Sequence, residues 1–322
     1  MLIAGFDIGG TKCATVLARV DDGQIAFISR REIATAGAWR DILGRMADNV
    51  AEQLAEGGFA AGSLAKVGVS CGSPLDSKRG MILSPPNLPG WDNVPVCAIL
   101  SERFGVPAGL ANDADACAVA EWKFGAGRGF DNVVFITFGT GFGAGLILGG
   151  RLHAGPSGTA GEIGHVRLSD EGPVGYGKRG SFEGFCSGGG IAQQARTYFT
   201  EKLQMGEKPA LCPDFSALSA LTAKSIVQAA DKGDADAAAL LADIGRHFGR
   251  SVSMLIDLLN PEVIVAGGVY MRGCRHLEGA MREVIAREAL RVPAAACKIL
   301  PSELGEKIGD YGAIAAAMLG CD

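Results

Sequence analysis

The spacing of apolar and polar residues predicts a chain in which strands and helices alternate. Near the N-terminus, short apolar runs separated by turn residues predict three strands, at residues 3–6, 13–20 and 25–33. Apolar residues then recur at helical spacing from Trp39 to about Ala55. Further strands are predicted at residues 65–70, 108–111, 134–138 and within 260–269, and further helices at residues 94–104, 116–124, 191–205, 222–259 with a break near Gly233, and 309 to about 319.

The first predicted hairpin carries a turn suited to phosphate. Asp7 ends the first strand, Gly9 and Gly10 turn the chain, and Thr11 and Lys12 add a hydroxyl and a positive charge. Because glycine has no Cβ, the backbone N–H groups of this turn can approach an anion closely. A carboxylate at the strand end can hold a hydrated Mg²⁺ beside phosphates. The residues equally allow a plain hairpin with a solvated Asp7.

The same pattern of strand, glycine turn and strand recurs at residues 134–148, where Gly139, Thr140 and Gly141 form the turn. Two phosphate-type hairpins in one chain suggest a duplicated domain that closes on a nucleotide from both sides. The sequence contains no Walker loop, since G-x-x-x-x-G-K-[ST] does not occur. It contains no Rossmann fingerprint either, because a strand and not a helix follows each turn.

Composition limits the class of protein. The chain has 322 residues, of which 48 % are hydrophobic and 20 % charged, so a large core and about two domains are expected. The net charge of −5 argues against a nucleic-acid partner, because phosphate contacts need clustered Lys and Arg. We expect no membrane span and no signal peptide. The nine cysteines form no C-x-x-C pair, which predicts reduced thiols and a cytoplasmic protein.

Polar residues near predicted strand ends leave a structural and a catalytic role open. Asp113 lies two residues after the strand predicted at residues 108–111, near a helix N-terminus, and is either a helix N-cap or a general base for a substrate hydroxyl. Asn87 lies in a proline-rich loop that either packs plainly or contacts a sugar. His165 is either a satisfied loop histidine or part of a site, and Glu183 is either a partner of a helix dipole or a ligand-binding carboxylate.

These motifs together resemble the ROK group of bacterial sugar kinases and regulators, within the actin–hexokinase–Hsp70 ATPase fold. The resemblance covers nearly the whole chain. Its motifs are F-D-I-G-G-T-K at 6–12, P-N-L-P-G-W at 86–91, N-D-A at 112–114, T-F-G-T-G-F-G-A-G at 137–145, G-E-I-G-H at 161–165, E-x-x-x-S-G at 183–188 and N-P-E-V-I-V-A-G-G at 260–268. It implies an α/β, two-domain actin-like ATPase (ribonuclease H-like) fold, with duplicated βββαβα domains and an interdomain cleft. The expected domains are residues 1–120 plus 309–322, and residues 121–308.

The resemblance also implies an activity and site residues. It implies an ATP-dependent sugar kinase that uses Mg²⁺, in which Asp113 is the catalytic base on a sugar hydroxyl, usually the 6-OH of a hexose. Asp7 would hold Mg²⁺ through water. The residues implied for ATP are Asp7, Gly9, Gly10, Thr11, Lys12, Gly139, Thr140, Gly141, Gly267 and Gly268, and those implied for sugar are Asn87, Asn112, Asp113, Glu162, His165 and Glu183.

The chain departs from the family pattern at the family's usual zinc site. That site uses the histidine of the G-E-x-G-H motif and three cysteines, but the cysteine positions are Val174, Tyr176 and Ser181 here. Because structural zinc needs four N, S or O ligands, we expect no zinc. We expect packing to hold the loop instead, through Tyr176, Phe182 and Phe185. Further departures at Leu75 and Asp115 leave the sugar open among glucose, fructose, mannose, allose, N-acetylglucosamine and N-acetylmannosamine.

Two other classes of protein compete with the kinase. Sugar-responsive regulators of the same family carry an N-terminal helix-turn-helix, for which the hairpin beginning at residue 3 leaves no room. Other actin-fold ATPases would leave the sugar motifs unexplained. The resemblance further implies a homodimer, with a small-molecule sugar and ATP as partners and with neither nucleic acid nor membrane.

Overall fold

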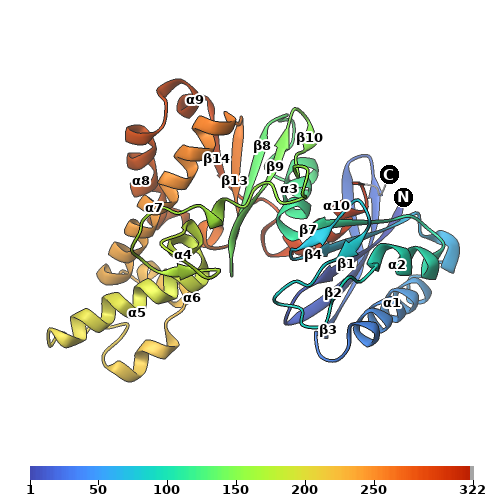
Figure 1. The fold of residues 1–322 in the computed structure, drawn as a ribbon, viewed down its shortest axis with the longest axis horizontal. Helices are drawn as coiled ribbons and strands as arrows, with labels where there is room; N and C mark the ends of the chain where they lie inside the picture. The colour runs from blue at the N-terminus through green and yellow to red at the C-terminus, as the bar shows by residue number, and fades with distance from the viewer. Residues whose placement is uncertain (320–322) are drawn as a thin grey trace. The chain divides into compact units, whose positions relative to one another are not determined.

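The structure is a computed structural model that describes residues 1–319, and the chain divides into two compact units (Figure 1). The first unit holds residues 1–129, 145–160 and those from Glu306 onward. The second unit holds residues 130–144 and 161–305. The first unit thus extends past residue 120, the predicted boundary, and includes a segment predicted for the other domain. The last three residues of the predicted first domain lie outside the described residues.

The first unit is built on a five-stranded sheet ordered β3-β2-β1-β4-β7. Its strands are β1 (Leu2–Ile8), β2 (Lys12–Asp21), β3 (Gln24–Ala34), β4 (Lys66–Cys71) and β7 (Ala108–Asn112). The first three strands are antiparallel, as predicted for a hairpin, whereas β4 and β7 run parallel to β1. Ile8, Cys71 and Asn112 lie in one row of the register, so the carboxyl ends of three strands meet at one edge.

Helices cover both faces of this sheet. They are α1 (Trp39–Glu56), α2 (Val96–Phe104), α3 (Asp113–Phe124) and α10 (Ile308–Ala316). Phe6 and Ile8 of β1 belong to the core that α1 and α2 complete, whereas Ile3 packs with Ala313 of α10 on the opposite face. This alternation along β1 follows from the period of two in a strand, and it explains why β1 is apolar on both faces from Leu2 to Phe6, before Asp7.

A row of glycines lets α10 lie directly on the sheet. Gly5, Gly68 and Gly109 are neighbours across β1, β4 and β7. A Cβ at Gly68 would lie 2.0 Å from the carbonyl oxygen of Ala313, and one at Gly109 would lie 2.4 Å from that of Ala316. Part of the high glycine content therefore serves close packing between a helix and a sheet rather than turns.

The second five-stranded sheet is ordered β10-β9-β8-β13-β14, and the division between the units falls within β9. Its strands are β8 (Val133–Phe138), β9 (Phe142–Leu148), β10 (Arg151–Leu152), β13 (Val263–Ala266) and β14 (Lys298–Pro301). The longer helices of the second unit are α5 (Gly188–Gln204), α6 (Ala223–Asp231), α7 (Ala235–Leu259) and α8 (Gly268–Glu288), and the short ones are α4 (Phe182–Cys186) and α9 (Arg291–Ala296). Two-residue strands form the hairpins β5 (Leu75–Asp76) with β6 (Met81–Ile82) and β11 (Val174–Gly175) with β12 (Lys178–Arg179).

The sequence pattern did not predict α8, α9 and β14. Gly267-Gly268 indicates only a turn, but α8 begins at Gly268, whose φ of 58° suits glycine. The helix then packs against α7 through two glycines of α7. A Cβ at Gly245 would lie 2.5 Å from the carbonyl oxygen of Leu277, and one at Gly249 would lie 2.7 Å from that of Met281. Charged residues separate the buried positions of α8, which weakens its apolar periodicity.

Two properties expected from composition concern the described residues only. No helix among residues 1–319 combines the length and the apolar character needed to cross a bilayer. The described cysteines are all free thiols.

Candidate functional site

The second glycine turn and the loop before α4 are joined in the second unit. Glu183, in the first turn of α4, accepts a hydrogen bond through Oε2 from the backbone N–H of Phe142 at 3.2 Å. A Cβ at Gly141 would lie 3.1 Å from the same oxygen. The backbone N–H of Gly188 donates to the carbonyl oxygen of Gly139 at 2.7 Å. The turn at residues 139–141 and the Glu183 carboxylate therefore form one local structure.

The turn before α8 lies against the same hairpin. A Cβ at Gly268 would lie 2.1 Å from the carbonyl oxygen of Phe138, which directly precedes the second glycine turn. Only glycine fits this approach, and only glycine readily adopts the φ of 58° found there. The structure thus brings together Gly139 and Gly268, two residues that the sequence analysis assigned separately to ATP.

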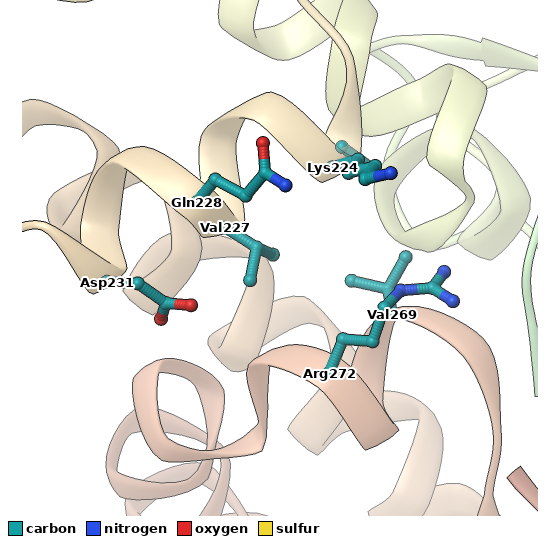
Figure 2. Close-up of a pocket in the computed structure, with 7 residues that line it drawn as sticks. Lys224, Val227, Gln228, Asp231, Val269 and Arg272 are labelled. Carbon is teal, nitrogen blue, oxygen red and sulfur yellow. The ribbon is translucent and has the colours of Figure 1, made fainter.

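A pocket of about 280 Å³ opens between α6 and α8 next to this turn (Figure 2). Val227 of α6 and Val269 of α8 form its apolar walls, while Gln228 of α6 and Arg272 of α8 bring polar groups to it. Its remaining lining residues are Ala223, Lys224 and Asp231. The α6 side of this pocket could not be predicted from the sequence, because α6 carries no recognisable motif.

The loop at residues 161–181 holds Glu162 and His165, whose side chains are both exposed. The carbonyl oxygen of His165 accepts a hydrogen bond from Lys178 Nζ at 2.7 Å. The imidazole ring of His165 stands edge-on to the ring of Tyr176, with 6.3 Å between the ring centroids. Ser181 is buried and caps α4 by accepting from the backbone N–H of Gly184. Val174 pairs across the hairpin with Arg179. The three positions of the family's cysteines are thus occupied by a strand residue, a turn residue and a helix cap.

The packing expected to hold this loop is only partly as predicted. Phe182 is fully buried, and Phe185 stacks on the ring of His247 at 4.0 Å. A Cβ at Gly172 would lie 2.4 Å from Phe185, so the loop packs closely on this ring. Tyr176, however, is 67 % exposed, because it occupies the tip of the hairpin with a positive φ of 44°. Hydrogen bonds between Gln193 and the backbone of Val174 replace the expected aromatic contact.

In the first unit, Asn112 and Asp113 stand at the carboxyl edge of the sheet. Asn112 is the N-cap of α3, and both its Oδ1 and the Oδ1 of Asp113 accept from the backbone N–H of Ala114, at 2.9 Å and 2.8 Å. Asn112 Nδ2 donates to Ser73 Oγ at 2.7 Å. Asp113 is therefore not the cap itself, and its side chain remains accessible to solvent. The protein mass around it raises the pKa of its carboxyl by desolvation.

Asn87 lies beside the first glycine turn. A Cβ at Gly10 would lie 2.5 Å from the backbone oxygen of Asn87 and 2.9 Å from its Cβ. A Cβ at Gly72, in the loop after β4, would lie 3.6 Å from Asn87 Nδ2. The proline-rich loop thus rests on two glycines, and it places Asn87 in the same unit as Asn112 and Asp113.

Asp7 carries a carboxylate with unusual surroundings. Among residues 1–319, no side chain or backbone group donates a hydrogen bond to it. Burial, followed by the negative charges of Asp310 and Asp113, raises the pKa of Asp7 to about 6. A Cβ at Gly309, at the start of α10, would lie 3.0 Å from Asp7 Oδ2. The carboxylates of Asp310 and Asp113 therefore both act electrostatically on that of Asp7.

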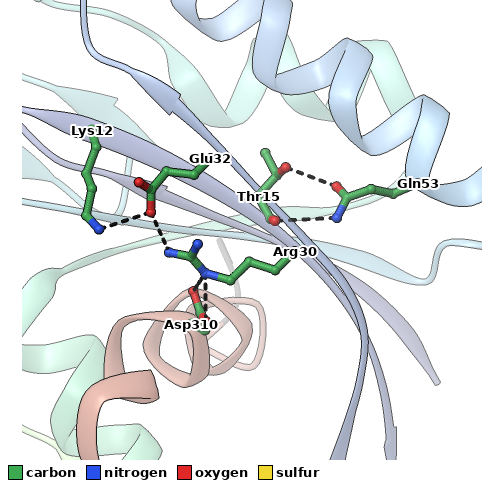
Figure 3. Close-up of polar contacts among 6 residues, drawn as sticks. All are labelled: Lys12, Thr15, Arg30, Glu32, Gln53 and Asp310. Atoms are coloured by element: carbon green, nitrogen blue, oxygen red, sulfur yellow. Dashed lines mark hydrogen bonds and ion pairs between the residues drawn. The ribbon is translucent and has the colours of Figure 1, made fainter.

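A chain of ion pairs connects the first glycine turn to α10 (Figure 3). Lys12 Nζ donates to Glu32 at 3.0 Å, and Arg30 donates to Glu32 at 3.0 Å through its NH2 group. Arg30 Nε lies 3.0 Å from both carboxylate oxygens of Asp310. Arg30 and Asp310 were not predicted as site residues from the sequence. The only available signal was an aspartate placed directly after a glycine at the start of the last helix.

The chain resembles known proteins in both sequence and fold. The chain matches the ROK family over residues 3–319. It is 31 % identical over 313 residues to the glucokinase of Thermotoga maritima, covering 97 % of this chain and 95 % of that protein. A crystal structure of a ROK hexokinase from Thermus thermophilus shares 28 % identity with a TM-score of 0.79, covering 99 % and 98 % of the two chains. A ROK family glucokinase from Streptomyces griseus, in complex with glucose and AMPPNP, shares 29 % identity with a TM-score of 0.77, covering 99 % and 100 %.

Proposed function

The chain belongs to the ROK family and is an ATP-dependent sugar kinase with the actin-like ATPase fold, and from this premise we propose that it transfers the γ-phosphate of Mg-ATP to the 6-hydroxyl of a hexose or N-acetylhexosamine, with Asp113 as general base. The observation that carries the proposal is the setting of Asp113. One oxygen is held by the backbone at the start of α3, and the side chain stays open to solvent.

This setting suits proton abstraction. Phosphoryl transfer depends mostly on positioning and on stabilising charge, so the base must point correctly and remain ionised. The hydrogen bond from Ala114 N to Oδ1 fixes the carboxylate, which leaves Oδ2 to accept the proton of the sugar hydroxyl. Desolvation raises the pKa of Asp113, which brings it closer to the operating pH and makes it a stronger base.

We assign the remaining polar groups to sugar recognition. In the first unit these are Asn87 and Asn112, both tied to the backbone framework around Asp113. In the second unit they are Glu162, His165 and Glu183. Carboxylates accept hydrogen bonds from sugar hydroxyls, and amides both donate and accept, so adjacent hydroxyls can be held together.

ATP binding is assigned to both glycine turns and to the pocket between α6 and α8. The first turn comprises Gly9, Gly10, Thr11 and Lys12, and the second comprises Gly139, Thr140 and Gly141. The contact of Gly268 with the strand that leads into the second turn supports a continuous surface for phosphates and nucleoside. In the pocket, Val227 and Val269 offer apolar walls for a flat base.

Filling the pocket should weaken ATP binding selectively. Gln228 is exposed at the pocket, so Gln228→Trp places an indole there without disturbing the core. We expect KM for ATP to rise about tenfold, because the indole would remove a modest set of contacts between the pocket and the nucleotide. KM for sugar should stay unchanged. Steady-state kinetics at saturating sugar measures this. Lys232→Trp, just beyond the end of α6, is the matched control. A sugar KM that rises as much as the ATP KM would contradict the assignment.

Mg²⁺ fits the residues at the edge of the first sheet. Asp7 is largely enclosed, repelled by two other carboxylates and without a hydrogen-bond donor among residues 1–319. No three His, Cys, Asp or Glu side chains of the described chain converge as direct metal ligands. Mg²⁺ typically keeps several waters and uses one or two carboxylates, a role that Asp7 can fill. The bound ion would neutralise charge on the phosphates.

Glycine at position 10 should matter for the sugar as well as for phosphate. A Cβ there would press on the backbone and Cβ of Asn87, so Gly10→Ala must displace the loop. Small displacements of positioning groups can cost up to about 100-fold, and we expect KM for sugar to rise about tenfold. Gly44→Ala is the matched control, because a Cβ in that helix meets nothing within 4 Å. An unchanged sugar KM in Gly10→Ala would show that Asn87 does not contact the sugar.

A coupled ADP-release screen tests the function as a whole. We expect strong, sugar-dependent ADP release with one or more of glucose, fructose, mannose, allose, N-acetylglucosamine and N-acetylmannosamine, and product analysis should place the phosphate on the 6-hydroxyl. The competing class, a non-catalytic sugar-responsive regulator, is not favoured by the glucokinase relatives. Sugar binding without ADP release would support that class instead.

We also propose that the enzyme works in the cytoplasm as a homodimer. ATP is supplied in that compartment, and the free cysteines of the described chain suit a reducing environment. Light scattering coupled to size exclusion measures the oligomer directly.

A further inference from the structure

We propose that Asp310 is the second carboxylate of the Mg²⁺ site, acting on the ion through its water shell, and that Arg30 is the positioning residue that fixes it. This inference rests on the proposed Mg-ATP-dependent reaction. It adds two residues that no motif of the chain identifies.

Asp310 stands beside Asp7 because of how α10 begins. Asp7 Oδ2 faces the first turn of α10, where a Cβ at Gly309 would lie only 3.0 Å away. Glycine at that position leaves the space that the carboxylate occupies, and Asp310 is the next residue. Its side chain is only 12 % exposed. Among the neighbouring charged groups, Asp310 raises the pKa of Asp7 the most, followed by Asp113.

Asp310 is held in one orientation by Arg30. The Nε of Arg30 lies 3.0 Å from both oxygens of Asp310, and the NH2 group of the same guanidinium lies 3.0 Å from Glu32. Glu32 in turn holds Lys12 of the first glycine turn. A guanidinium has fixed geometry, so engaging Glu32 with one group sets the direction from which it meets Asp310 (Figure 3). Lys12, Glu32, Arg30 and Asp310 therefore form one network.

The charges around Asp7 do not balance without a cation. The acidic groups are Asp7, Glu32, Asp113 and Asp310, and the basic groups are Lys12 and Arg30. Four negative charges against two positive charges leave a net charge of −2. Because Glu32 and Arg30 are paired, the excess negative charge lies on the carboxylates at the edge of the sheet, which are Asp7, Asp113 and Asp310. A partly enclosed excess of this size is unfavourable alone and is complementary to one divalent cation.

The ion pair between Arg30 of β3 and Asp310 of α10 does not need to lie next to Asp7 in order to stabilise the fold. An ion pair that only joined β3 to α10 would be at least as stable away from Asp7, where no like charge would oppose it. Placing the Asp310 carboxylate next to Asp7 instead adds repulsion, which is expected where a cation is bound. Mg²⁺ accepts such a site, because it retains waters that outer carboxylates can orient.

Mn²⁺ binding, followed by electron paramagnetic resonance of the free ion, tests this without relying on turnover. We expect Asp310→Asn in the full-length protein to raise the Kd for Mn²⁺ about tenfold or more, as for other outer-sphere partners. Arg30→Lys keeps a positive charge next to Asp310 but loses the planar guanidinium that fixes its orientation, so the Kd of this variant should rise by less. The Mg²⁺ concentration for half-maximal rate should shift in parallel, while KM for sugar should not. Asp21→Asn, an exposed aspartate at the end of β2, is the control.

The outcomes separate this inference from the proposed function. If Asp7→Asn abolishes Mn²⁺ binding but Asp310→Asn leaves it within about twofold of wild type, Asp310 has no role at the metal and the proposed metal site stands. The same holds if both Asp310→Asn and Arg30→Lys only lower the melting temperature, because that is the behaviour of an ion pair that serves the fold alone. If wild type binds no Mn²⁺, or if Asp7→Asn binds it normally, both the metal site and this inference fail.

Discussion

Asp113→Asn is expected to lower kcat by about 100- to 10,000-fold, the usual cost of losing a general base. Amide and carboxylate have nearly the same shape, and an amide oxygen can still accept the hydrogen bond from Ala114 N. The side chain can therefore stay in place, but it can no longer take the proton of the sugar hydroxyl. Sugar affinity should consequently remain within a fewfold of wild type, since the hydroxyl can still hydrogen-bond to the amide.

Two measurements check this expectation together. A coupled assay gives kcat, and calorimetric titration with the preferred sugar gives Kd. Asp115→Asn is the matched control, because it makes the same chemical change two residues further along α3. Its kcat should stay within about tenfold of wild type. If Asp113→Asn keeps more than half of wild-type turnover, Asp113 is not the base. If it keeps neither turnover nor sugar binding, Asp113 serves binding as well.

The parts of the fold that could be predicted are those encoded locally. Both hairpins follow from short apolar runs around glycine turns, and the helix at residues 39–56 follows from its apolar spacing. The position of Asp113 at a strand end also follows from local sequence. These features depend on neighbours within a few residues, where periodicity and turn chemistry act directly.

Other features depend on residues far apart in the sequence. Arg30 and Asp310 are 280 positions apart, and only the packing of α10 on the first sheet brings them together. That packing needs the glycine row of Gly5, Gly68 and Gly109, which looks in the sequence like three unrelated small residues within strands. The start of α8 was missed for a related reason. Gly268 lets the start of α8 lie close to the backbone of Phe138, whereas the sequence alone indicates only a turn at this glycine.

The loop at residues 161–181 shows a third limit. The resemblance places Val174, Tyr176 and Ser181 at the positions of the zinc-site cysteines, but it does not show which contacts hold the loop in this chain. The structure shows a two-stranded hairpin, a serine cap and Gln193 bonded to the backbone. Aromatic residues near a missing site were the natural candidates, yet Tyr176 points mostly to solvent. Hydrogen bonds from a side chain such as Gln193 to a distant backbone group have no sequence signature, so they could not be predicted from the sequence.

Asp7→Asn is expected to lower activity about 100-fold, because the variant loses a carboxylate that helps to hold the metal ion. The same substitution is also expected to stabilise the metal-free protein at neutral pH. Burial and two like charges raise the pKa of Asp7 from 3.8 to about 6, so the folded protein favours the protonated form. Each pKa unit corresponds to about 1.4 kcal/mol. Because the side chain is not fully enclosed, solvent screening reduces the total to about 2 kcal/mol.

The sign of this effect sets its pH dependence. Well below pH 4, Asp7 is protonated in both the folded and the unfolded chain, so it costs no stability and the variant has no advantage. Between about pH 4 and pH 6, the unfolded chain ionises first, and the wild type loses stability as pH rises. Above pH 6 the full cost is present. The advantage of Asp7→Asn should therefore grow through this window and level off above it, as measured by denaturant unfolding in EDTA at several pH values.

Adding Mg²⁺ should then reverse the comparison. The ion stabilises only a protein that binds it, so the free energy of unfolding of the wild type should rise with Mg²⁺ concentration at pH 7.5 while that of Asp7→Asn stays nearly constant. Asp21→Asn, in the same unit and exposed, should follow the wild type in both series. An advantage of Asp7→Asn that is equal at pH 4 and pH 7.5 would show that it does not arise from ionisation. A variant less stable than the wild type in EDTA at pH 7.5 would show that the Asp7 carboxylate is already satisfied within the fold, and the charge argument for a cation at this edge would fail with it.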